Sequence, residues 1–269
     1  SDPVWVPVQD LCREHGFDWG DEEAVDVACG EDFTLILTGA GTLITMGSNE
    51  YCCQGKDLWV TNVQTACSQE AGVQEKWVRV FAGTHHCVAL SDTGRCFSWG
   101  WNGHGQVGVG SSVSVIPSPR LVQALDGLLV TQVAAGLFHT LFLTDAGAVY
   151  GCGSVADGQL GFKLECSCCE PSLLEDFQLE ETVLAVAAGK RHSIILVETP
   201  HLGWRCLACG NNTFGQCGEH ESGSSDEPWE EKEDVQTTVM QCVWEGRDPD
   251  ALPSVGIAAG PHQSFLWNR

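Results

Sequence analysis

Residues 133–161, VAAGLFHTLFLTDAGAVYGCGSVADGQLG, contain the pattern that decides the fold. The stretch begins with an Ala-Gly element, which is followed by an apolar run, a turn at Gly147 and a second apolar run. It ends in the glycine-rich sequence DGQLG. Because two short apolar runs on either side of a glycine turn are typical of paired antiparallel strands, the stretch predicts a β-hairpin.

The same pattern recurs along the chain at a fixed spacing. Similar stretches begin at Val27, Phe81 and Val186, and a shorter copy, IAAGPHQSFLW, begins at Ile257. The glycine of the Ala-Gly element falls at Gly30, Gly83, Gly136, Gly189 and Gly260, so the spacings are 53, 53, 53 and 71 residues. The connecting segments open with Pro and contain further short apolar runs. Four strands in each repeat predict the blades of a β-propeller.

The repeats resemble those of the regulator of chromosome condensation family, in which A-A-G-x-x-H is followed by W-G and then by G-Q-L-G. The resemblance covers most of residues 25–267 and is strongest in 133–161 and in FAGTHHCVALSDTGRCFSWGWNGHGQVG, residues 81–108. In the first repeat Phe33 takes the His position, and in the fifth His262 comes one place early. The resemblance implies a β-propeller, which in this family usually has seven blades.

We therefore expect an all-β fold, a β-propeller of four-stranded blades that forms one domain over residues 1–269. About five blades, or part of a seven-bladed ring, are expected. The repeats lie near residues 25–56, 79–110, 131–162, 183–218 and 255–269. An acidic insertion over residues 219–236 accounts for the longer last spacing.

Charge restricts the partners that the chain is expected to bind. Asp and Glu number 36 and Lys and Arg only 13, which gives a formal net charge of −23. Such a charge argues against direct binding of DNA or RNA and against an anionic membrane surface. It favours a protein partner with a basic surface.

Compartment is predicted from targeting signals and from the cysteines. The longest apolar run, residues 128–143, is interrupted by polar residues, so no membrane span is expected. The N-terminal sequence SDPVWVPVQD lacks the basic and apolar regions of a signal peptide. Fifteen cysteines at irregular spacing favour reduced thiols. We expect an intracellular protein, cytoplasmic or nuclear.

Two recurring motifs, each present in three copies, allow a chemical and an architectural interpretation. The glycine loops at 103–108, 157–161 and 214–218 could hold a phosphate, but no Lys and no helix pattern accompanies them, so blade geometry is favoured. His86, His139 and His192 could bind a metal. A buried imidazole bonded to a backbone carbonyl in each blade is favoured instead.

The cysteine clusters and the tryptophans also have simple interpretations. Cys166, Cys168 and Cys169, and the pair Cys206 and Cys209, lack the partner pair of a zinc site, so neither a metal nor any other cofactor is expected. The plant ultraviolet-B receptor of the same family clusters tryptophans in Gly-Trp-Arg-His-Thr motifs. The matching stretches GTHHC, GLFHT and GKRHS contain no Trp, so photoreception is not expected.

Candidate partner-binding residues lie where the repeats differ. Trp99 is expected in the core and Trp101 at an exposed loop tip. Trp101 is replaced by Ser and Asn in later repeats, and His104 by Asp and Phe. The acidic insertion adds an aromatic anchor, although a solvated loop is the simpler interpretation. The candidates are Trp101, Asn102, His104, Asp157, Phe214, Trp229, Glu230 and Glu231.

Two function classes remain. No GxSxG motif, nucleophile arrangement or positioned carboxylate pair is present, so an enzyme is not expected. We expect a protein-interaction scaffold that serves as a subunit of a larger complex. The alternative, which the resemblance implies, is guanine-nucleotide exchange on a Ran-like small GTPase, or its regulation. A histone is a further conceivable partner.

Overall fold

The computed structural model describes most of the repeats. The described residues are 22–51, 53, 64–65, 75–161, 167–174, 181–199, 203–218, 236–246 and 255–268. Within them the regular secondary structure is β-strand, apart from one short 3-10 helix at Gln123–Leu125. No helix of this described part is long and apolar enough to cross a membrane.

The strands form successive antiparallel sheets. The first sheet contains β1 (Ala24–Cys29), β2 (Phe33–Thr38), β3 (Leu43–Gly47) and β4 (Gln64–Thr65). The second contains β5 (Trp77–Ala82), β6 (His86–Ser91), β7 (Cys96–Trp101) and β8 (Val115–Leu121). The third contains β9 (Val130–Ala135), β10 (His139–Thr144), β11 (Val149–Gly153) and β12 (Cys168–Leu173). The fourth contains β13 (Thr182–Ala188), β14 (His192–Thr199), β15 (Gly203–Asn211) and β16 (Gln236–Gly246), and β17 (Val255–Gly260) pairs with β18 (Gln263–Asn268).

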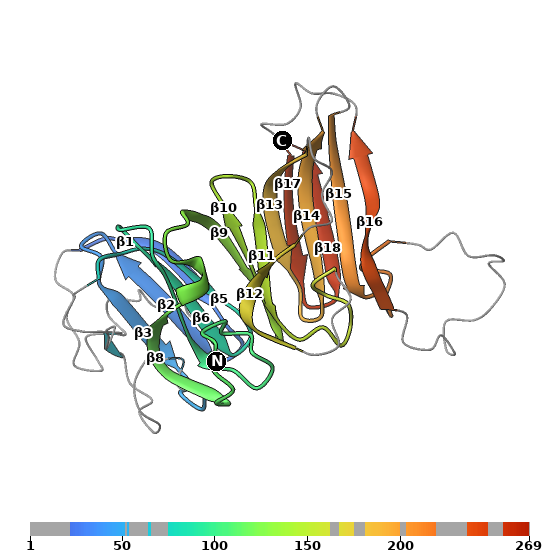
Figure 1. Cartoon of the computed structure of the whole chain (residues 1–269). Coiled ribbons are helices and arrows are strands. Elements are labelled where there is room, and N and C mark those ends of the chain that lie inside the picture. The colour runs from blue at the N-terminus through green and yellow to red at the C-terminus, as the bar shows by residue number, and fades with distance from the viewer. Residues whose placement is uncertain are drawn as a thin grey trace, which may run out of the picture.

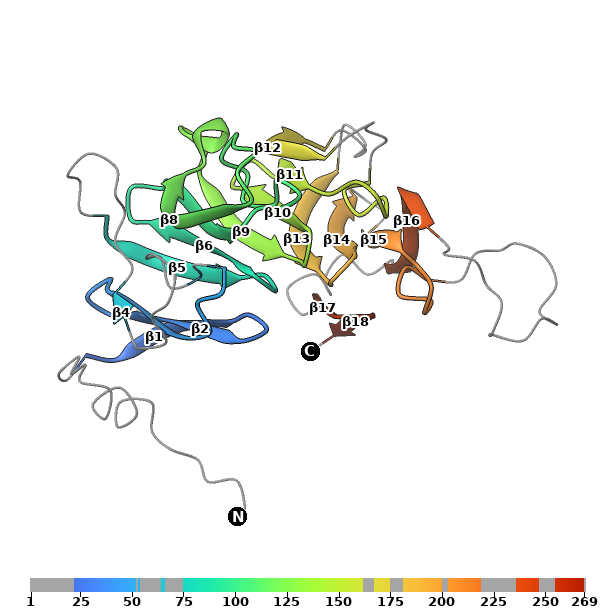
Figure 2. The ribbon, with the colours of Figure 1, turned by 90° about the horizontal axis from the view of Figure 1, so that it is seen from below.

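The sheets are the blades of a β-propeller. In each sheet the order of the strands in space follows their order in the chain. The sheets follow one another around an arc, with β1, β5, β9, β13 and β17 on its inner side (Figures 1 and 2). The prediction of an all-β propeller with four-stranded blades is confirmed. The extent of the domain over residues 1–269 stays a prediction.

A glycine is the last or the penultimate residue of the third strand in each four-stranded blade. Gly153, at the end of β11, has φ of +106°, and Gly47, Gly100 and Gly210 at the equivalent positions have φ between +103° and +115°. A Cβ atom on Gly153 would also collide with the carbonyl oxygen of Phe138. This backbone conformation and this close approach explain the glycine that ends every W-G or C-G element.

The hydrophobic core lies between neighbouring blades. Leu35 and Leu37 of β2 pack in one cluster with Val80, Phe97 and Trp99 of the second blade. Equivalent clusters join the second blade to the third and the third to the fourth. Trp99 is fully buried, as the sequence predicted. Burial of each such large side chain contributes roughly 1.5–3 kcal/mol, so the contacts between blades are a main source of stability.

The recurring histidines join adjacent blades. Nε2 of His86 lies 2.7 Å from Oγ1 of Thr140 on the next blade, and His139 meets Ser193 at 2.9 Å. His192 meets Ser264 in the same way at 3.2 Å. The histidines are buried as predicted, but the predicted backbone-carbonyl partner is wrong, because each Nε2 meets a hydroxyl of the following blade.

The hydroxyl groups determine the histidine tautomer. Thr140 donates to the carbonyl of Gln106 at 2.6 Å, and Ser193 donates to the carbonyl of Gln159 at 2.6 Å. Since a hydroxyl has one proton and a carbonyl can only accept, Nε2 of the imidazole must donate. Burial lowers the pKa of His86 and His139 to about 3 and that of His192 to about 4, so all three are neutral at pH 7.

Between the first and second blades, an apolar contact takes the place of the hydrogen bond between histidine and hydroxyl. Phe33 takes the histidine position of the first blade, and Cys87 takes the hydroxyl position of the second. The Cys87 thiol and the Trp99 indole both donate to the carbonyl of Cys53, at 3.4 and 3.0 Å. The carbonyl at this position therefore accepts from the next blade whether or not a histidine is present.

Candidate functional site

Five short loops surround the inner end of the arc. Each connects the first strand of a sheet to the second and contains two residues after the Ala-Gly element. These two-residue segments are Glu31–Asp32, Thr84–His85, Leu137–Phe138, Lys190–Arg191 and Pro261–His262. Their backbones are joined around the axis, because Glu31 N donates to Thr84 O at 3.1 Å and Leu137 N donates to Lys190 O at 3.1 Å. The loops therefore form one connected rim.

A hollow of about 380 Å³ lies inside this rim and is lined mainly by the alanines and glycines of the five Ala-Gly elements. Glu31 and Lys190 face each other here, with Oε1 and Nζ 3.8 Å apart, and Nε2 of His85 lies 3.2 Å from Oε2 of Glu31. In the described loops the N–H groups of Gly83, Gly136 and Gly189 donate within their own turns. These three glycine N–H groups are therefore not free to bind an anion in the hollow.

Side chains meet in equivalent pairs where one blade adjoins the next. Tyr51, His104, Asp157 and Phe214 occupy the same place in successive loops that follow the third strand. Each contacts the second residue of the next inner loop. The ring centroids of Tyr51 and His85 are 4.7 Å apart, those of His104 and Phe138 are 4.7 Å apart, and those of Phe214 and His262 are 5.1 Å apart, while Arg191 Nε lies 2.8 Å from Asp157 Oδ2. We call these four contacts the junction pairs and the surface that contains them, with the rim, the junction face.

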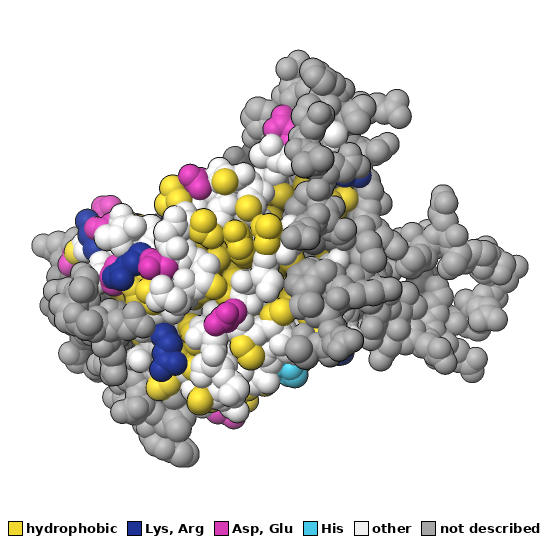
Figure 3. All heavy atoms as spheres, in the orientation of Figure 1, with side chains coloured by type: hydrophobic (Ala, Val, Ile, Leu, Met, Phe, Trp, Pro, Cys, Tyr) yellow, Lys and Arg dark blue, Asp and Glu magenta, His cyan; other side chains and the backbone are white. Residues whose placement is uncertain are grey.

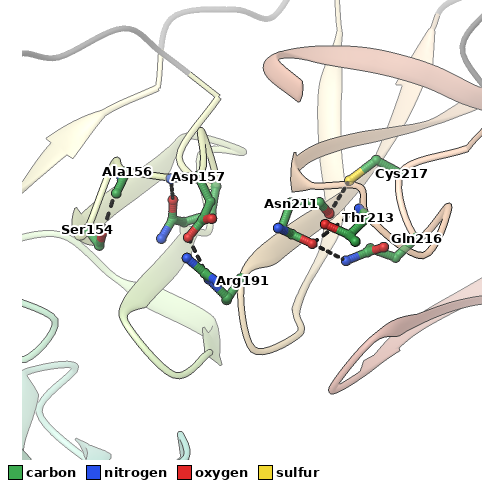
Figure 4. A network of polar contacts seen from close by, with 9 residues as sticks. Ser154, Ala156, Asp157, Arg191, Asn211, Thr213, Gln216 and Cys217 are labelled. Carbon is green, nitrogen blue, oxygen red and sulfur yellow. Dashed lines mark hydrogen bonds and ion pairs between the residues drawn. The ribbon is translucent and has the colours of Figure 1, made fainter. Parts of the chain in front are cut away.

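Asp157 is buried rather than presented to solvent. Its side chain is 4% exposed, and its backbone N–H donates to the Gln159 side chain at 2.9 Å. The Arg191 guanidinium reaches it from the next blade, as Figure 4 shows. The expectation that Asp157 offers a free partner-binding side chain is therefore wrong, since its carboxylate is occupied by Arg191, which is the exposed member of the pair.

Asn102 holds its loop together from inside. It is 3% exposed, its Nδ2 donates to the carbonyls of Ser111 at 2.7 Å and Val113 at 2.9 Å, and its Oδ1 accepts from Val107 N. Asn212 makes equivalent contacts with Gly218 and Cys217 in the fourth blade. The expectation that Asn102 lies at an exposed loop tip is wrong, because its amide satisfies the backbone groups of the loop.

Trp101 is half-buried rather than fully exposed, and its ring contacts four others. Its centroid lies 5.8 Å from Tyr51, 5.9 Å from His85, 5.6 Å from His104 and 5.7 Å from Phe138. We call these five side chains the aromatic cluster. It joins the first three blades across the junction face.

The remaining candidates fall into two groups. Phe214 is 68% exposed, as expected of a partner-binding residue. Trp229, Glu230 and Glu231 lie outside the described residues. Within the part of the chain that the structure describes, no three His, Cys, Asp or Glu side chains are placed to hold a metal ion.

Five residues of the junction pairs were not among the sequence candidates. They are Tyr51, His85, Phe138, Arg191 and His262. Tyr51 lies one 53-residue period before His104, so the repeat spacing could have identified it. The other four required knowledge of which loops become neighbours.

Charge is sparse on the face that Figure 3 shows. Hydrophobic side chains gather there over β9–β11, while Lys, Arg, Asp and Glu side chains of the described residues lie apart or in small groups. Exposed apolar residues of the described part include Leu129 and Val113, at 51% and 60%. The net charge of the chain alone therefore does not locate a partner, and individual carboxylates have to be considered.

Comparison with known families gives a consistent result. The family model described as Regulator of chromosome condensation (RCC1) repeat matches residues 93–143 and 146–196. A second model with the same description matches residues 24–51, 77–106 and 130–159. The matched segments include the Ala-Gly elements and inner loops of the first four blades.

Curated relatives are much longer than this chain. Probable E3 ubiquitin-protein ligase HERC3 of Homo sapiens is 35% identical over 152 residues, which cover 55% of this chain and 14% of that protein. E3 ubiquitin-protein ligase HERC2 of Homo sapiens is 28% identical over 255 residues, 92% of this chain and 5% of that protein. The chain thus spans only a small part of these relatives.

A solved structure shares the fold. Prp20p from Saccharomyces cerevisiae, described together with its binding properties to Gsp1p and histones, superposes with a TM-score of 0.70 and 19% sequence identity. The match covers 92% of this chain and 56% of that one. At this identity the likeness shows the propeller fold alone.

Proposed function

The chain belongs to the regulator of chromosome condensation (RCC1) repeat family, and from this premise we propose that it is a non-enzymatic protein-interaction module whose junction face binds a partner protein. One observation carries the proposal. The four junction pairs occupy one position of the repeat, yet they combine aromatic, imidazole, carboxylate and guanidinium groups in different ways. A constant frame with varied chemistry at its surface suits recognition of a specific protein.

The setting of the module is part of the proposal. It acts as a subunit or domain within a larger assembly, inside the cell, in the cytoplasm or the nucleus. Support for the assembly comes from the small share of its relatives that the chain spans. Support for the compartment comes from five buried free thiols among the described residues, those of Cys53, Cys87, Cys96, Cys152 and Cys217.

The preferred partner has a basic surface. The net charge of −23 favours association with a cationic protein and disfavours direct contact with DNA, RNA or an anionic membrane. A histone fits this chemistry, and the Prp20p structure is described with histone binding, which supports its inclusion among the proteins to test.

Capture of partners from the native cell tests the proposal. Phe214→Asp replaces the most exposed aromatic of the junction face by the residue that occupies this position in the third blade. Leu129→Asp is the matched control, because Leu129 is a 51% exposed apolar residue in the connection between β8 and β9, beside the turn at Gly94. We expect a partner that the wild type and Leu129→Asp retain and Phe214→Asp loses. Equal retention by all three proteins would reject the junction face as the binding surface.

Guanine-nucleotide exchange is the second candidate function. The observation that favours it is the shared fold with Prp20p, which is described as binding Gsp1p. The test is release of a fluorescent guanine nucleotide from a panel of small GTPases, Ran-like proteins included. No acceleration across the panel removes exchange and leaves the interaction module unaffected, whereas acceleration with one GTPase would reject the non-enzymatic proposal.

A further inference from the structure

The aromatic cluster is specific to one part of the junction face. Its central residue, Trp101, stands where the other described blades have Ser48, Ser154 and Asn211. A large ring replaces a small polar side chain at this one place. It brings Tyr51 of the first blade and Phe138 of the third into contact with the same indole, at 5.8 and 5.7 Å. The result is a half-buried aromatic surface across three blades.

Carboxylates border this surface at the first blade. Glu31 and Glu50 are both exposed. Glu50 directly precedes Tyr51 in the chain, and Oε2 of Glu31 lies 3.2 Å from Nε2 of His85, another ring of the cluster. The pKa of Tyr51 is raised, first by burial and next by the adjacent Glu50 carboxylate, with a further contribution from Glu31. Among the described residues Glu50 forms no ion pair, whereas Glu31 lies near His85 and Lys190.

On the third-blade side of the cluster, a cation already lies against an aromatic ring. The Arg191 guanidinium carbon lies 6.0 Å from the Phe138 ring centroid, so a cation of the chain itself already lies against the cluster. Aromatic faces attract cations and the nearby carboxylates repel anions. The exposed Glu31 and Glu50 carboxylates therefore disfavour an anionic ligand at this border.

We propose that the aromatic cluster, together with Glu31 and Glu50, binds an arginine or lysine side chain from a basic segment of the partner protein. This inference rests on the proposed function and specifies its partner. The cationic group lies against Trp101 or Tyr51 while the carboxylates of the first blade neutralise its charge. The segment crosses from the first blade toward the third.

Binding of two short peptides tests this directly. The probe is a fluorescent peptide of arginine, glycine and serine. The control peptide has citrulline in place of every arginine, which keeps the shape of the side chain and removes its charge. We expect the arginine peptide to bind and the citrulline peptide to bind at least about tenfold more weakly in an anisotropy titration. Equal binding of the two peptides would overturn the inference.

Variants separate the cluster from general attraction to an acidic protein. Trp101→Ser installs the residue that two other blades carry at this position, and it changes no charge. We expect it to weaken the arginine peptide about tenfold, Trp101→Phe to restore most of the binding, and Phe214→Asp, outside the cluster, not to weaken it. Full binding by a folded Trp101→Ser protein would overturn the inference.

The carboxylates and the natural partner give independent readouts. Glu50→Gln should weaken the binding of the arginine peptide a few-fold and flatten its dependence on salt. A captured native partner that Phe214→Asp loses and Trp101→Ser retains would overturn this inference while leaving the proposed function intact. A partner unaffected by any junction-face variant would reject both.

Discussion

Arg191 donates a hydrogen bond of 2.8 Å from Nε to Oδ2 of Asp157 at the place in the repeat where the preceding junction sets the His104 ring against Phe138. The two contacts link loops with the same sequence separation of 34 residues. One backbone geometry therefore accommodates an ion pair and an aromatic pair. This equivalence is the basis for assigning recognition to the junction face.

The Asp157–Arg191 pair is expected to be exchangeable as a unit. Arg191→Phe alone leaves a buried carboxylate without its cation and should cost about 1–3 kcal/mol of unfolding free energy. Adding Asp157→His recreates the preceding pair and should recover at least half of the loss. Urea unfolding of both single variants and the double variant gives the coupling. Additive losses would show that the two positions do not act as a pair.

The buried histidines predict loss of stability in acid. Burial lowers the folded-state pKa of His86 and His139 to about 3, against about 6.5 in the unfolded chain. Between these values the unfolded state binds more protons, so stability falls as pH falls below about 6.5, by up to about 1.4 kcal/mol per pH unit for each group. Urea unfolding between about pH 7 and about pH 4 measures this slope.

His139→Gln provides the control for the acid effect. The fifth repeat has Gln263 at the histidine position, so the frame accepts glutamine there. The variant should show a shallower decline of stability with falling pH than the wild type, because one buried imidazole has been removed. Identical slopes in the two proteins would contradict the assignment of the acid effect to these histidines.

Thr140 is predicted to stabilise the second junction through its hydroxyl. Thr140→Val leaves the His86 donor and the Gln106 carbonyl without their shared partner and should cost about 2–4 kcal/mol. Thr140→Ser keeps the hydroxyl, as Ser193 does in the next blade, and should cost much less. Thermal unfolding measures the loss of stability in both variants. A similar loss in the two would attribute the stability to packing and not to the hydrogen bonds.

Adjacent blades approach closely at the Ala-Gly element, so one added methyl group is expected to lower stability strongly. A Cβ atom on Gly136 would lie 2.6 Å from the carbonyl oxygen of Gly189 on the next blade, so Gly136→Ala should cost about 3 kcal/mol or more. Gly39→Ala is the control, since its nearest neighbour would be 3.7 Å away. Comparable stability of the two variants in urea would contradict the packing described for the rim.

The sequence predicted the blades well and the face poorly. The spacing of Gly30, Gly83 and Gly136 located the first strands, because a Cβ atom at each of these positions would collide with the ring that heads the second strand. His104 and Phe138 are far apart in sequence, and only the order of the blades brings their rings together. Asn102 was misplaced because a polar loop residue has the same sequence pattern whether it faces water or binds its own backbone.

Photo-crosslinking from the junction face tests the central claim most directly. A photoreactive phenylalanine analogue replaces Phe214 in one protein and Leu129 in another, two exposed positions, of which only Phe214 lies on the junction face. We expect the native partner to crosslink to position 214 and not to position 129. Crosslinking at position 129 with none at position 214 would contradict that claim.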